Sequence, residues 1–279
     1  MKLSVITDEI SQDLEHAVQV MQEYQVRGAE LRGLWNVNIA DIDDATARRA
    51  KKLLDANGIR VTSIASPFYK CDLFEEGTEA RGPMHLATPR DLSEQMDMLF
   101  RCIDLAHLFE TPIIRVFSFW KRGDLTPEIE QRIIDAFAEP VKLAEQNEVV
   151  LALENEHSCY IGTGVEAARV VQAVGSPHLR VCWDPGNALC AGETPYPDGY
   201  EAVRQMVVHV HVKDGVLEDG KVRFVVVGEG IIDYAGQFES LRHDGYTGWV
   251  SLETHARIDG DSEQASRLSL QALRRWIQE

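Results

Sequence analysis

Short apolar segments rich in Val and Ile alternate with helical segments along the whole chain, and this alternation limits the folds available to it. Strands that read as continuous apolar runs and alternate with helices belong to parallel sheets covered on both faces. Eight such units in about 250 residues form a (β/α)8 barrel. The sequence therefore predicts an α/β fold, a TIM barrel, as a single domain over residues 1–279. The eight apolar segments are residues 3–7, 28–34, 61–67, 113–119, 149–157, 180–188, 207–215 and 248–255.

Six intervening segments show the apolar face of a helix, around residues 14–26, 47–54, 96–106, 129–144, 167–174 and 265–277. An open dinucleotide-binding sheet would carry GxGxxG after an early strand, and none of the early apolar segments does. Two long connections, residues 68–91 and 215–233, depart from the minimal pattern, and the second contains VRFVVV, a predicted hairpin strand. Because loops after barrel strands lie at the catalytic face, both are candidate lids, although a variable surface insertion would also fit.

Composition excludes several classes of partner. A formal charge of -17 at pH 7 opposes binding to nucleic acid and to anionic lipid. No apolar run approaches the roughly 18 residues of a membrane span, and the N-terminal residues lack the pattern of a secretory signal, so we expect a cytoplasmic protein. The cysteines show no CxxC pair and are expected to be buried, reduced thiols: Cys71, Cys102, Cys159, Cys182 and Cys190.

Polar residues gather at the carboxyl ends of the last four apolar segments, where the chemistry of this fold takes place. Three carboxylates and one imidazole that converge there would repel one another unless a cation lay between them. An oxygen-rich set with one nitrogen favours Mn2+, with Mg2+, Co2+ or Zn2+ as alternatives. The sequence therefore predicts one divalent metal ion bound by Glu154, Asp184, His211 and Glu253.

The segment VVHVHVKDG places His209, His211 and Lys213 on one face of a strand, because side chains alternate between the two faces. His211 is the predicted ligand. His209 lies deeper on the same face and is expected either to support the ligand or to fill a layer of the barrel. Lys213, nearer the rim, is a candidate contact for substrate oxygens.

Other residues near the strand ends leave alternatives open. Glu156 shares the face of Glu154, and His157 is a candidate substrate contact where the strand ends. Arg115 is expected to form a structural ion pair. The remaining candidates are Glu9 and Glu30 for substrate contact, and Trp120 and Phe68 for the pocket wall or ordinary packing.

At the segments LALENEH, VCWDPGNA, HVHVKDG, VVGEGIIDY and VSLETH the chain resembles the xylose isomerase-like superfamily of TIM barrels, in particular its sugar phosphate isomerase/epimerase branch. The resemblance implies that Glu154, Asp184, His211 and Glu253 hold one divalent ion, and that Glu154 and Glu253 exchange the α-proton of the substrate. The ketose 3-epimerases of that branch carry a histidine where this chain has Asn187, and an arginine where it offers Lys213. Asn187 and Lys213 are therefore candidate substrate-binding residues, and dimers or tetramers are common in the branch.

Three functions compete on this evidence. The first is a metal-dependent isomerase or epimerase that acts on a small sugar or polyol-derived ketone through an enediolate. The second is a dehydratase of an inosose-like or dehydroshikimate-like keto-polyol, as in the inosose dehydratases that the chain also resembles. The third, endonuclease IV-like DNA repair, needs further histidines at the earlier strand ends, and these offer Ser66, Pro67, Phe117 and Ser118 instead. No arginine cluster marks a phosphate site, although the GEG at 228–230 could lend backbone amides.

Overall fold

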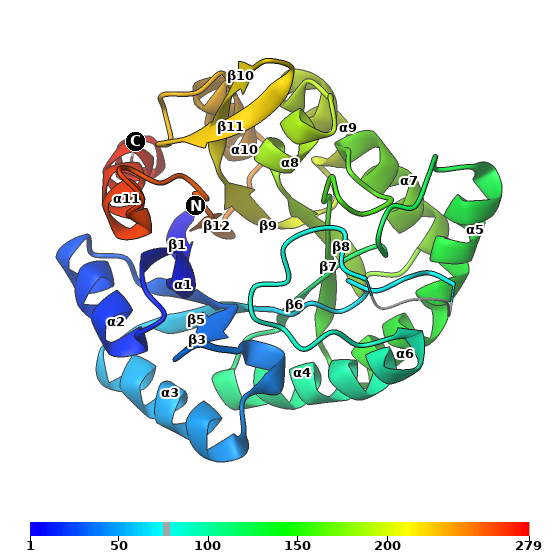
Figure 1. Ribbon diagram of the computed structural model, residues 1–279, viewed down its shortest axis with the longest axis horizontal. Helices are drawn as coiled ribbons and strands as arrows, with labels where there is room; N and C mark the ends of the chain where they lie inside the picture. Colours follow the sequence, from blue (N-terminus) through cyan, green and yellow to red (C-terminus); the bar gives the residue numbers. More distant parts are fainter. Residues whose placement is uncertain (75–78, 279) are drawn as a thin grey trace.

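The computed structural model describes residues 1–74 and 79–278, which form a closed barrel of parallel strands inside a ring of helices (Figure 1). The TIM barrel prediction is confirmed, and each predicted apolar segment overlaps one barrel strand. Around the ring the strands are β1 (Lys2–Ile6), β2 (Gly28–Leu31), β5 (Arg60–Ala65), β6 (Ile113–Val116), β7 (Val150–Glu154), β8 (Leu179–Trp183), β9 (Val207–Val212) and β12 (Trp249–Leu252), which pairs with β1.

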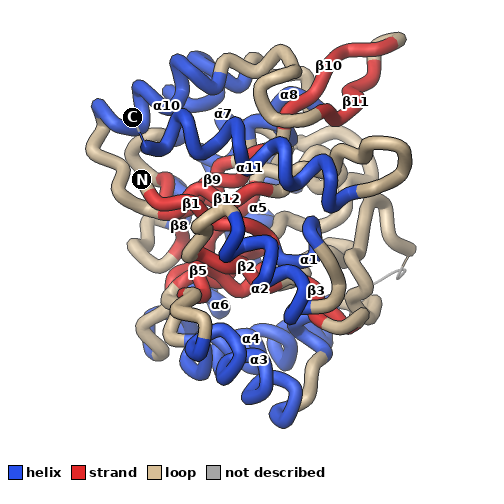
Figure 2. Tube along the Cα trace, turned by 90° about the vertical axis from the view of Figure 1, so that its left-hand side faces the viewer, coloured by secondary structure: helices blue, strands red, loops and turns tan. Residues whose placement is uncertain are grey.

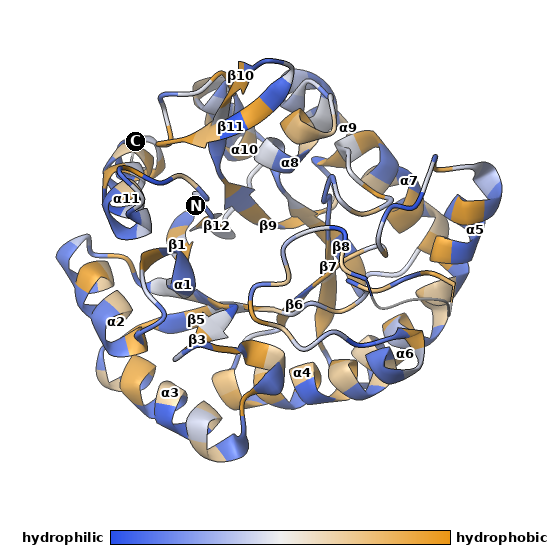
Figure 3. Cartoon of the chain, in the orientation of Figure 1, coloured by the Kyte–Doolittle hydropathy of each residue, from blue (hydrophilic) through white to orange (hydrophobic). Residues whose placement is uncertain are grey.

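The outer layer consists of helices with one apolar and one polar side (Figure 3). Its longer members are α2 (Leu14–Glu23), α3 (Asp44–Ala56), α4 (Gln95–Phe109), α5 (Pro127–Ala136), α6 (Ala138–Gln146), α7 (Gly164–Val174), α10 (Tyr234–His243) and α11 (Ser262–Gln278). The short ones are α1 (Thr7–Ile10), α8 (Pro185–Cys190) and α9 (Tyr200–Val203), with the turns η1 (Ile39–Asp41), η2 (Leu92–Glu94) and η3 (Pro195–Gly199). No helix in the described ranges has the length and apolarity that crossing a bilayer requires.

The helices differ from the sequence pattern in two places. The segment predicted as one helix around 129–144 is divided into α5 and α6, because Pro140 has no N–H to donate to Ala136. The Ala136 carbonyl accepts a hydrogen bond from the Tyr69 hydroxyl instead, at 2.8 Å. The pattern also misses α10, whose buried face includes the polar Gln237, held by the Trp183 indole N–H at 3.2 Å.

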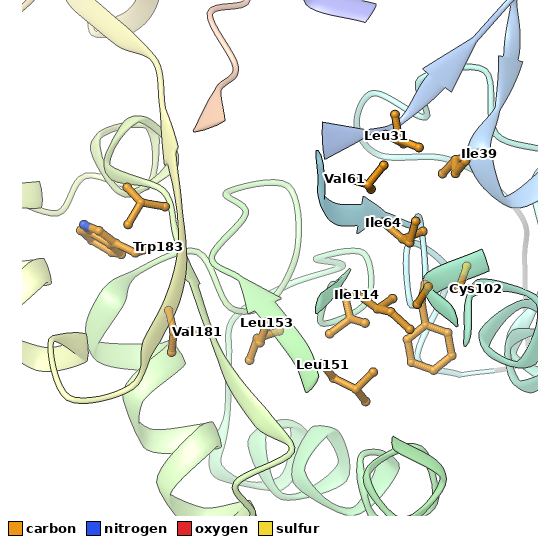
Figure 4. Close-up of a cluster of buried hydrophobic side chains, with 14 of the residues drawn as sticks. Leu31, Ile39, Val61, Ile64, Cys102, Ile114, Leu151, Leu153, Val181 and Trp183 are labelled. Atoms are coloured by element: carbon orange, nitrogen blue, oxygen red, sulfur yellow. The ribbon is translucent and has the colours of Figure 1, made fainter. Parts of the chain in front are cut away.

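The main core lies between the strands and the helices. Alternate strand residues point outward into it, among them Leu151, Leu153, Val181 and Ile114 (Figure 4). The interior of the barrel is polar in comparison. Ser4, Thr62 and Ser251 lie there with His209, all of them buried. Because Leu153 points outward, its neighbour Glu154 points inward toward the barrel axis.

Both long connections follow the carboxyl ends of barrel strands, and the second of them contains regular secondary structure. The second holds the antiparallel hairpin β10 (Asp214–Glu218) and β11 (Lys221–Val225), which projects from the barrel (Figure 2) and confirms the predicted hairpin strand. The first predicted lid, 68–91, is described except at 75–78, which lie outside the described residues. A second small hairpin, β3 (Gly33–Leu34) with β4 (Val37–Asn38), follows β2.

Candidate metal centre

The four predicted ligands come together at the carboxyl ends of four neighbouring strands. Glu154 ends β7, Asp184 follows β8, His211 lies in β9 and Glu253 follows β12. Each offers a ligand atom within 4.8 Å of those of the other three, and all four side chains are buried. From His211 Nδ1 it is 3.4 Å to Glu154 Oε1, 3.4 Å to Glu253 Oε2 and 3.8 Å to Asp184 Oδ2. The parallel register thus assembles an oxygen-rich cluster around one imidazole nitrogen.

One nitrogen of this cluster, His211 Nδ1, is buried without a hydrogen-bond partner among the described residues, and Asp184 Oδ2 forms no hydrogen bond although the Lys213 ammonium lies 2.9 Å away. Buried polar atoms are rarely left unsatisfied in proteins. Burial, opposed by the Lys213 ammonium, raises the pKa of Asp184 to about 6. A divalent cation would satisfy both atoms and favour the ionised carboxylate, so the donor set fits such an ion.

Glu30 contacts His211 on the side of the ring opposite the cluster, at Nε2. Its Oε2 lies 2.8 Å from His209 Nε2 and 3.0 Å from His211 Nε2, at a position that is fully buried. Burial raises the pKa of the Glu30 carboxyl, but the two imidazoles outweigh it and hold that pKa well below its ordinary value. When both rings donate Nε2–H to this carboxylate, Nδ1 of His211 is left with a free lone pair. His209 thus shares the supporting position with Glu30. The prediction of Glu30 as a substrate contact is wrong, because its carboxylate is fully buried behind the two histidines.

Lys213 lies deeper than the sequence suggests. Its Nζ is 2.9 Å from Asp184 Oδ2 and 2.7 Å from Glu253 Oε2, and its side chain is only 1% exposed. The pKa of Lys213 is held well above its ordinary value, because Asp184 and Glu253 outweigh the effect of burial. The ammonium is therefore a countercharge to the ligand carboxylates as well as a donor that faces the centre.

Two buried arginines also pair with carboxylates of the cluster. Arg115 Nη1 donates to Glu154 Oε2 at 3.1 Å, which confirms the ion pair expected for it. Arg32 donates to Glu253 Oε1 at 2.7 Å and to Glu9 Oε1 at 2.5 Å, and it is only 2% exposed. Arg32 is the main residue that sequence reasoning misses, and its signal was a single arginine inside the apolar segment GAELRGL.

The predicted substrate contacts Glu156, His157 and Asn187 lie together beside Glu154. Asn187 Nδ2 donates to Glu154 Oε1 at 2.9 Å, and its Oδ1 is 3.4 Å from His157 Nδ1. His157 Nδ1 is 3.0 Å from Glu156 Oε1, and this hydrogen bond raises the pKa of His157. The His157 side chain is 41% exposed, so it is the part of this group that incoming molecules would meet first.

Both long connections reach the centre. His85 from the first and Phe224 from the second lie against the His255 ring, with ring centroids 5.7 Å and 5.4 Å away. His255 Nε2 is 3.4 Å from Glu253 Oε1. His85, Glu253 and His255 also offer ligand atoms close to one another, but the Arg32 guanidinium on Glu253 opposes a second cation there.

The aromatic candidates separate into two environments. Trp120 packs with Phe117 and Cys159, and the Lys70 ammonium lies over the Phe117 ring at 4.2 Å. Phe68 belongs to the main core and stacks on Tyr69 at 4.0 Å. Trp120 thus lies beside the charged groups of the mouth, whereas Phe68 is ordinary packing.

The barrel and its cluster define a class of protein, a TIM barrel with a candidate divalent-metal centre at the carboxyl ends of its strands. The sequence profile of a family described as xylose isomerase-like TIM barrel matches residues 18–276. The chain belongs to this family.

Its relatives include dehydratases and epimerases. Inosose dehydratase of Geobacillus thermodenitrificans is 25% identical over 237 residues, which cover 76% of each protein. A putative L-ribulose-5-phosphate 3-epimerase UlaE of Shigella dysenteriae is 30% identical over 126 residues, which cover 45% of this chain and 43% of the epimerase. The chain thus aligns with less than half the length of that epimerase. In fold it is similar to the probable 3-DHS dehydratase AsbF of Bacillus anthracis, with a TM-score of 0.76, 19% identity, and 98% and 99% of the two chains covered.

Proposed function

We propose that this chain is an isomerase or epimerase that depends on one divalent metal ion and acts on a small sugar or polyol-derived ketone. Glu154, Asp184, His211 and Glu253 would hold the ion, with Mn2+ as the proposed metal because three ligands are oxygens and one is nitrogen. The observation that carries the proposal is the convergence of these four buried side chains, with the lone pair of His211 Nδ1 left without a hydrogen-bond partner among the described residues. A cytoplasmic location and a homo-oligomeric state stay predictions.

The chemistry needs a group that removes a proton α to a carbonyl and another that returns it. Glu154 and Glu253 come from β7 and β12, with the strands of Asp184 and His211 between them, so they approach from two sides. Arg115 and Asn187 orient the Glu154 carboxylate, and Arg32 and Lys213 orient that of Glu253. When bound, the metal would supply positive charge to stabilise the oxygens of the enediolate.

In the proposed reaction one of the two carboxylates accepts the α-proton as the C–H bond breaks, and the electron pair remains in the enediolate. The other, as the carboxylic acid, returns a proton to the opposite face of the same carbon. Because both carboxylates are buried and held by hydrogen bonds, their oxygens are oriented before substrate binds. Glu154 and Glu253 are therefore our proposed catalytic pair, and Glu156, His157, Asn187 and Lys213 the proposed substrate contacts.

A dehydratase is the second candidate, supported by the inosose dehydratase relative that aligns along three quarters of the chain. The same enediolate would then lose a hydroxyl from the β-carbon, which requires a proton donor for the departing oxygen. Lys213 and His157 are hydrogen-bond donors beside the ligand carboxylates that could take this role.

Solvent deuterium exchange tests the proposal and separates the two candidates. The Mn2+-loaded protein would be incubated in heavy water with a panel of ketoses and inososes, beside Glu253→Gln, and product followed by mass spectrometry and ultraviolet absorbance. We expect metal-dependent deuterium incorporation that Glu253→Gln abolishes, without a rise in enone absorbance. A rise in enone absorbance would instead identify the dehydratase, and no exchange with any member would contradict both.

A further inference from the structure

Phosphate recognition in proteins uses two kinds of group, cationic side chains that lack an internal partner and backbone amides that point at one spot. In TIM barrels this site commonly lies in the loops after the seventh and eighth strands. Here those strands are β9 and β12. The groups in these two loops, and the cations around the centre, therefore decide whether the site can take a phosphorylated ligand.

The backbone amides after β9 are already occupied by a carboxylate of the same chain. Asp214 accepts hydrogen bonds from the amides of Gly228 at 2.9 Å, Gly230 at 3.0 Å and Gly215 at 2.9 Å, and it is 1% exposed. A Cβ atom on Gly230 would lie 2.0 Å from Asp214 Oδ1, so only glycine lets the backbone close around this carboxylate. The amides that the sequence offered for phosphate thus bind Asp214.

The loop after β12 carries an exposed arginine, Arg257, which donates to the Gly260 carbonyl at 3.1 Å, and an exposed carboxylate, Asp261. It leads into α11, whose first amides are bound by Asp261, at 2.8 Å from Glu263 N and 3.3 Å from Gln264 N. The usual amide sites for an anion in this fold are therefore filled on both loops by the protein's own carboxylates.

The buried cations of the centre are likewise paired. Arg32 contacts Asp8, Glu9 and Glu253, and Arg115 contacts Glu154. Lys213 contacts Asp184 and Glu253. Lys70 donates to the Pro83 carbonyl at 3.0 Å and lies 3.7 Å from Glu156. In the described parts of the chain, each of these buried cations has a carboxylate neighbour, and residues 75–78 add two glutamates and no cation to the sequence.

The net charge of the centre is negative. Its four cationic side chains, Arg32, Lys70, Arg115 and Lys213, face seven carboxylates, those of Asp8, Glu9, Glu30, Glu154, Glu156, Asp184 and Glu253. A bound dication would leave one net negative charge, and protonation of His157 would only bring it to zero. A phosphate dianion would have to leave water for a site with no excess positive charge, which is unfavourable.

We propose that the substrate of this site is an uncharged polyhydroxy ketone and that phosphorylated ketoses are excluded, an inference that rests on the proposed function. Hydroxyl groups both donate to carboxylates and accept from ammonium or guanidinium groups. Hydroxyl groups therefore suit a centre in which the buried cations are already paired with carboxylates.

The test compares matched pairs of ligands on the Mn2+-loaded full chain. Deuterium incorporation would be measured for L-ribulose against L-ribulose 5-phosphate, and for D-fructose against D-fructose 6-phosphate. In parallel, inorganic phosphate would be titrated against chloride of equal ionic strength, with the thermal midpoint as the readout. We expect exchange at least tenfold faster with the uncharged member of a pair, and no shift of the midpoint that is specific to phosphate.

Faster exchange with the phosphorylated member would overturn the inference and leave the proposed proton transfer intact. A phosphate-specific rise of the midpoint would overturn it as well. Exchange with no ketose at all would contradict the proposed function, and the phosphate titration would still decide the inference because it needs no turnover. Asp214→Ala is the positive control. It frees the loop amides, so phosphate should raise the thermal unfolding midpoint of this variant.

Discussion

The two halves of the barrel contribute different chemistry to one centre. Strands β7, β8, β9 and β12 carry the proposed metal ligands Glu154, Asp184, His211 and Glu253, and we call them the ligand half. The countercharge half, strands β1, β2, β5 and β6 with the residues that follow them, carries Arg32 and Arg115 against those carboxylates and Glu30 against the histidines. The buried carboxylates are stable here because the countercharge half supplies the two arginines, while Lys213 from the ligand half pairs with Asp184 and Glu253.

Removal of a ligand should have the largest effect, since it breaks the ligand half directly. We expect Asp184→Ala to lower the rate of α-proton exchange about a thousandfold, equivalent to about 4 kcal/mol in activation free energy. The exchange assay in heavy water measures this, with Asp44→Ala on an exposed surface as the matched control. Retention of more than a tenth of the wild-type rate by Asp184→Ala would show that the ligand half is not required.

Removal of a countercharging arginine should lower the unfolding free energy of the protein more than it changes the exchange reaction. Arg32→Met leaves Asp8 and Glu9 buried without their arginine, and we expect a loss of about 3–5 kcal/mol in unfolding free energy. Urea unfolding of the metal-free protein measures it. The control is Arg48→Met, whose ion pair with Asp44 is exposed and should contribute about 1 kcal/mol or less. Equal losses in the two variants would contradict the role given to the countercharge half.

Glu30 links the two halves, and its substitution should affect metal affinity more than folding. Glu30→Gln presents an amide N–H to one of the two rings, so one histidine must change its tautomer or lose its hydrogen bond. We expect metal affinity to fall about 10–100-fold. Competition with a chelator measures the affinity, and the spectrum of the Co2+-loaded protein reports on the ligand set. An unchanged affinity would mean that Glu30 does not orient His211.

The smallest expected effect is at the rim, where His157 is paired with Glu156. The hydrogen bond that His157 donates to Glu156 raises the pKa of His157 in the folded protein. A raised folded-state pKa stabilises the protein below the unfolded pKa, and the contribution is lost as pH rises through the folded value. Glu156→Gln should therefore lower the pKa of His157, measured by NMR titration. The part of the stability loss that comes from His157 should appear only on the acidic side, whereas the loss of the charge beside Lys70 should also lower stability at neutral pH.

The part that comes from His157 should be small because the His157 ring is two-fifths exposed and screened by solvent. The same Glu156→Gln change in a His157→Asn background should lose its pH dependence around the histidine titration. A pH dependence that persists there would assign the effect to another group.

The ligand half could be predicted from the sequence because its features are local. Apolar segments ended in Glu154, Asp184 and Glu253, and strand alternation put His209 and His211 on one face. The four strands are neighbours in the closed barrel, so these strand ends come together once the fold is known. The same local pattern gave the strands of the fold correctly, since buried parallel strands read as continuous apolar runs.

Apart from the ion pair expected for Arg115, the countercharge half could not be predicted in the same way. Contact between Glu30 on β2 and the histidines on β9 depends on closure of the ring, with β1 and β12 between them. Arg32 lies inside an apolar segment, where its partners Asp8 and Glu9 come from a different element, α1. The depth of Lys213 also follows from where its partners lie, and strand alternation gives only its face.

The most direct test of the central claim is the metal content of the purified protein, measured by elemental analysis after loading with Mn2+ and dialysis. We predict close to one divalent ion per chain in the wild type and close to none in Asp184→Ala, because the four side chains are the proposed ligands. A wild-type chain that retains no divalent ion after loading with Mn2+, Mg2+, Co2+ or Zn2+ would contradict the account, and the cluster would then be a set of buried ion pairs that Lys213, Arg32 and Arg115 stabilise.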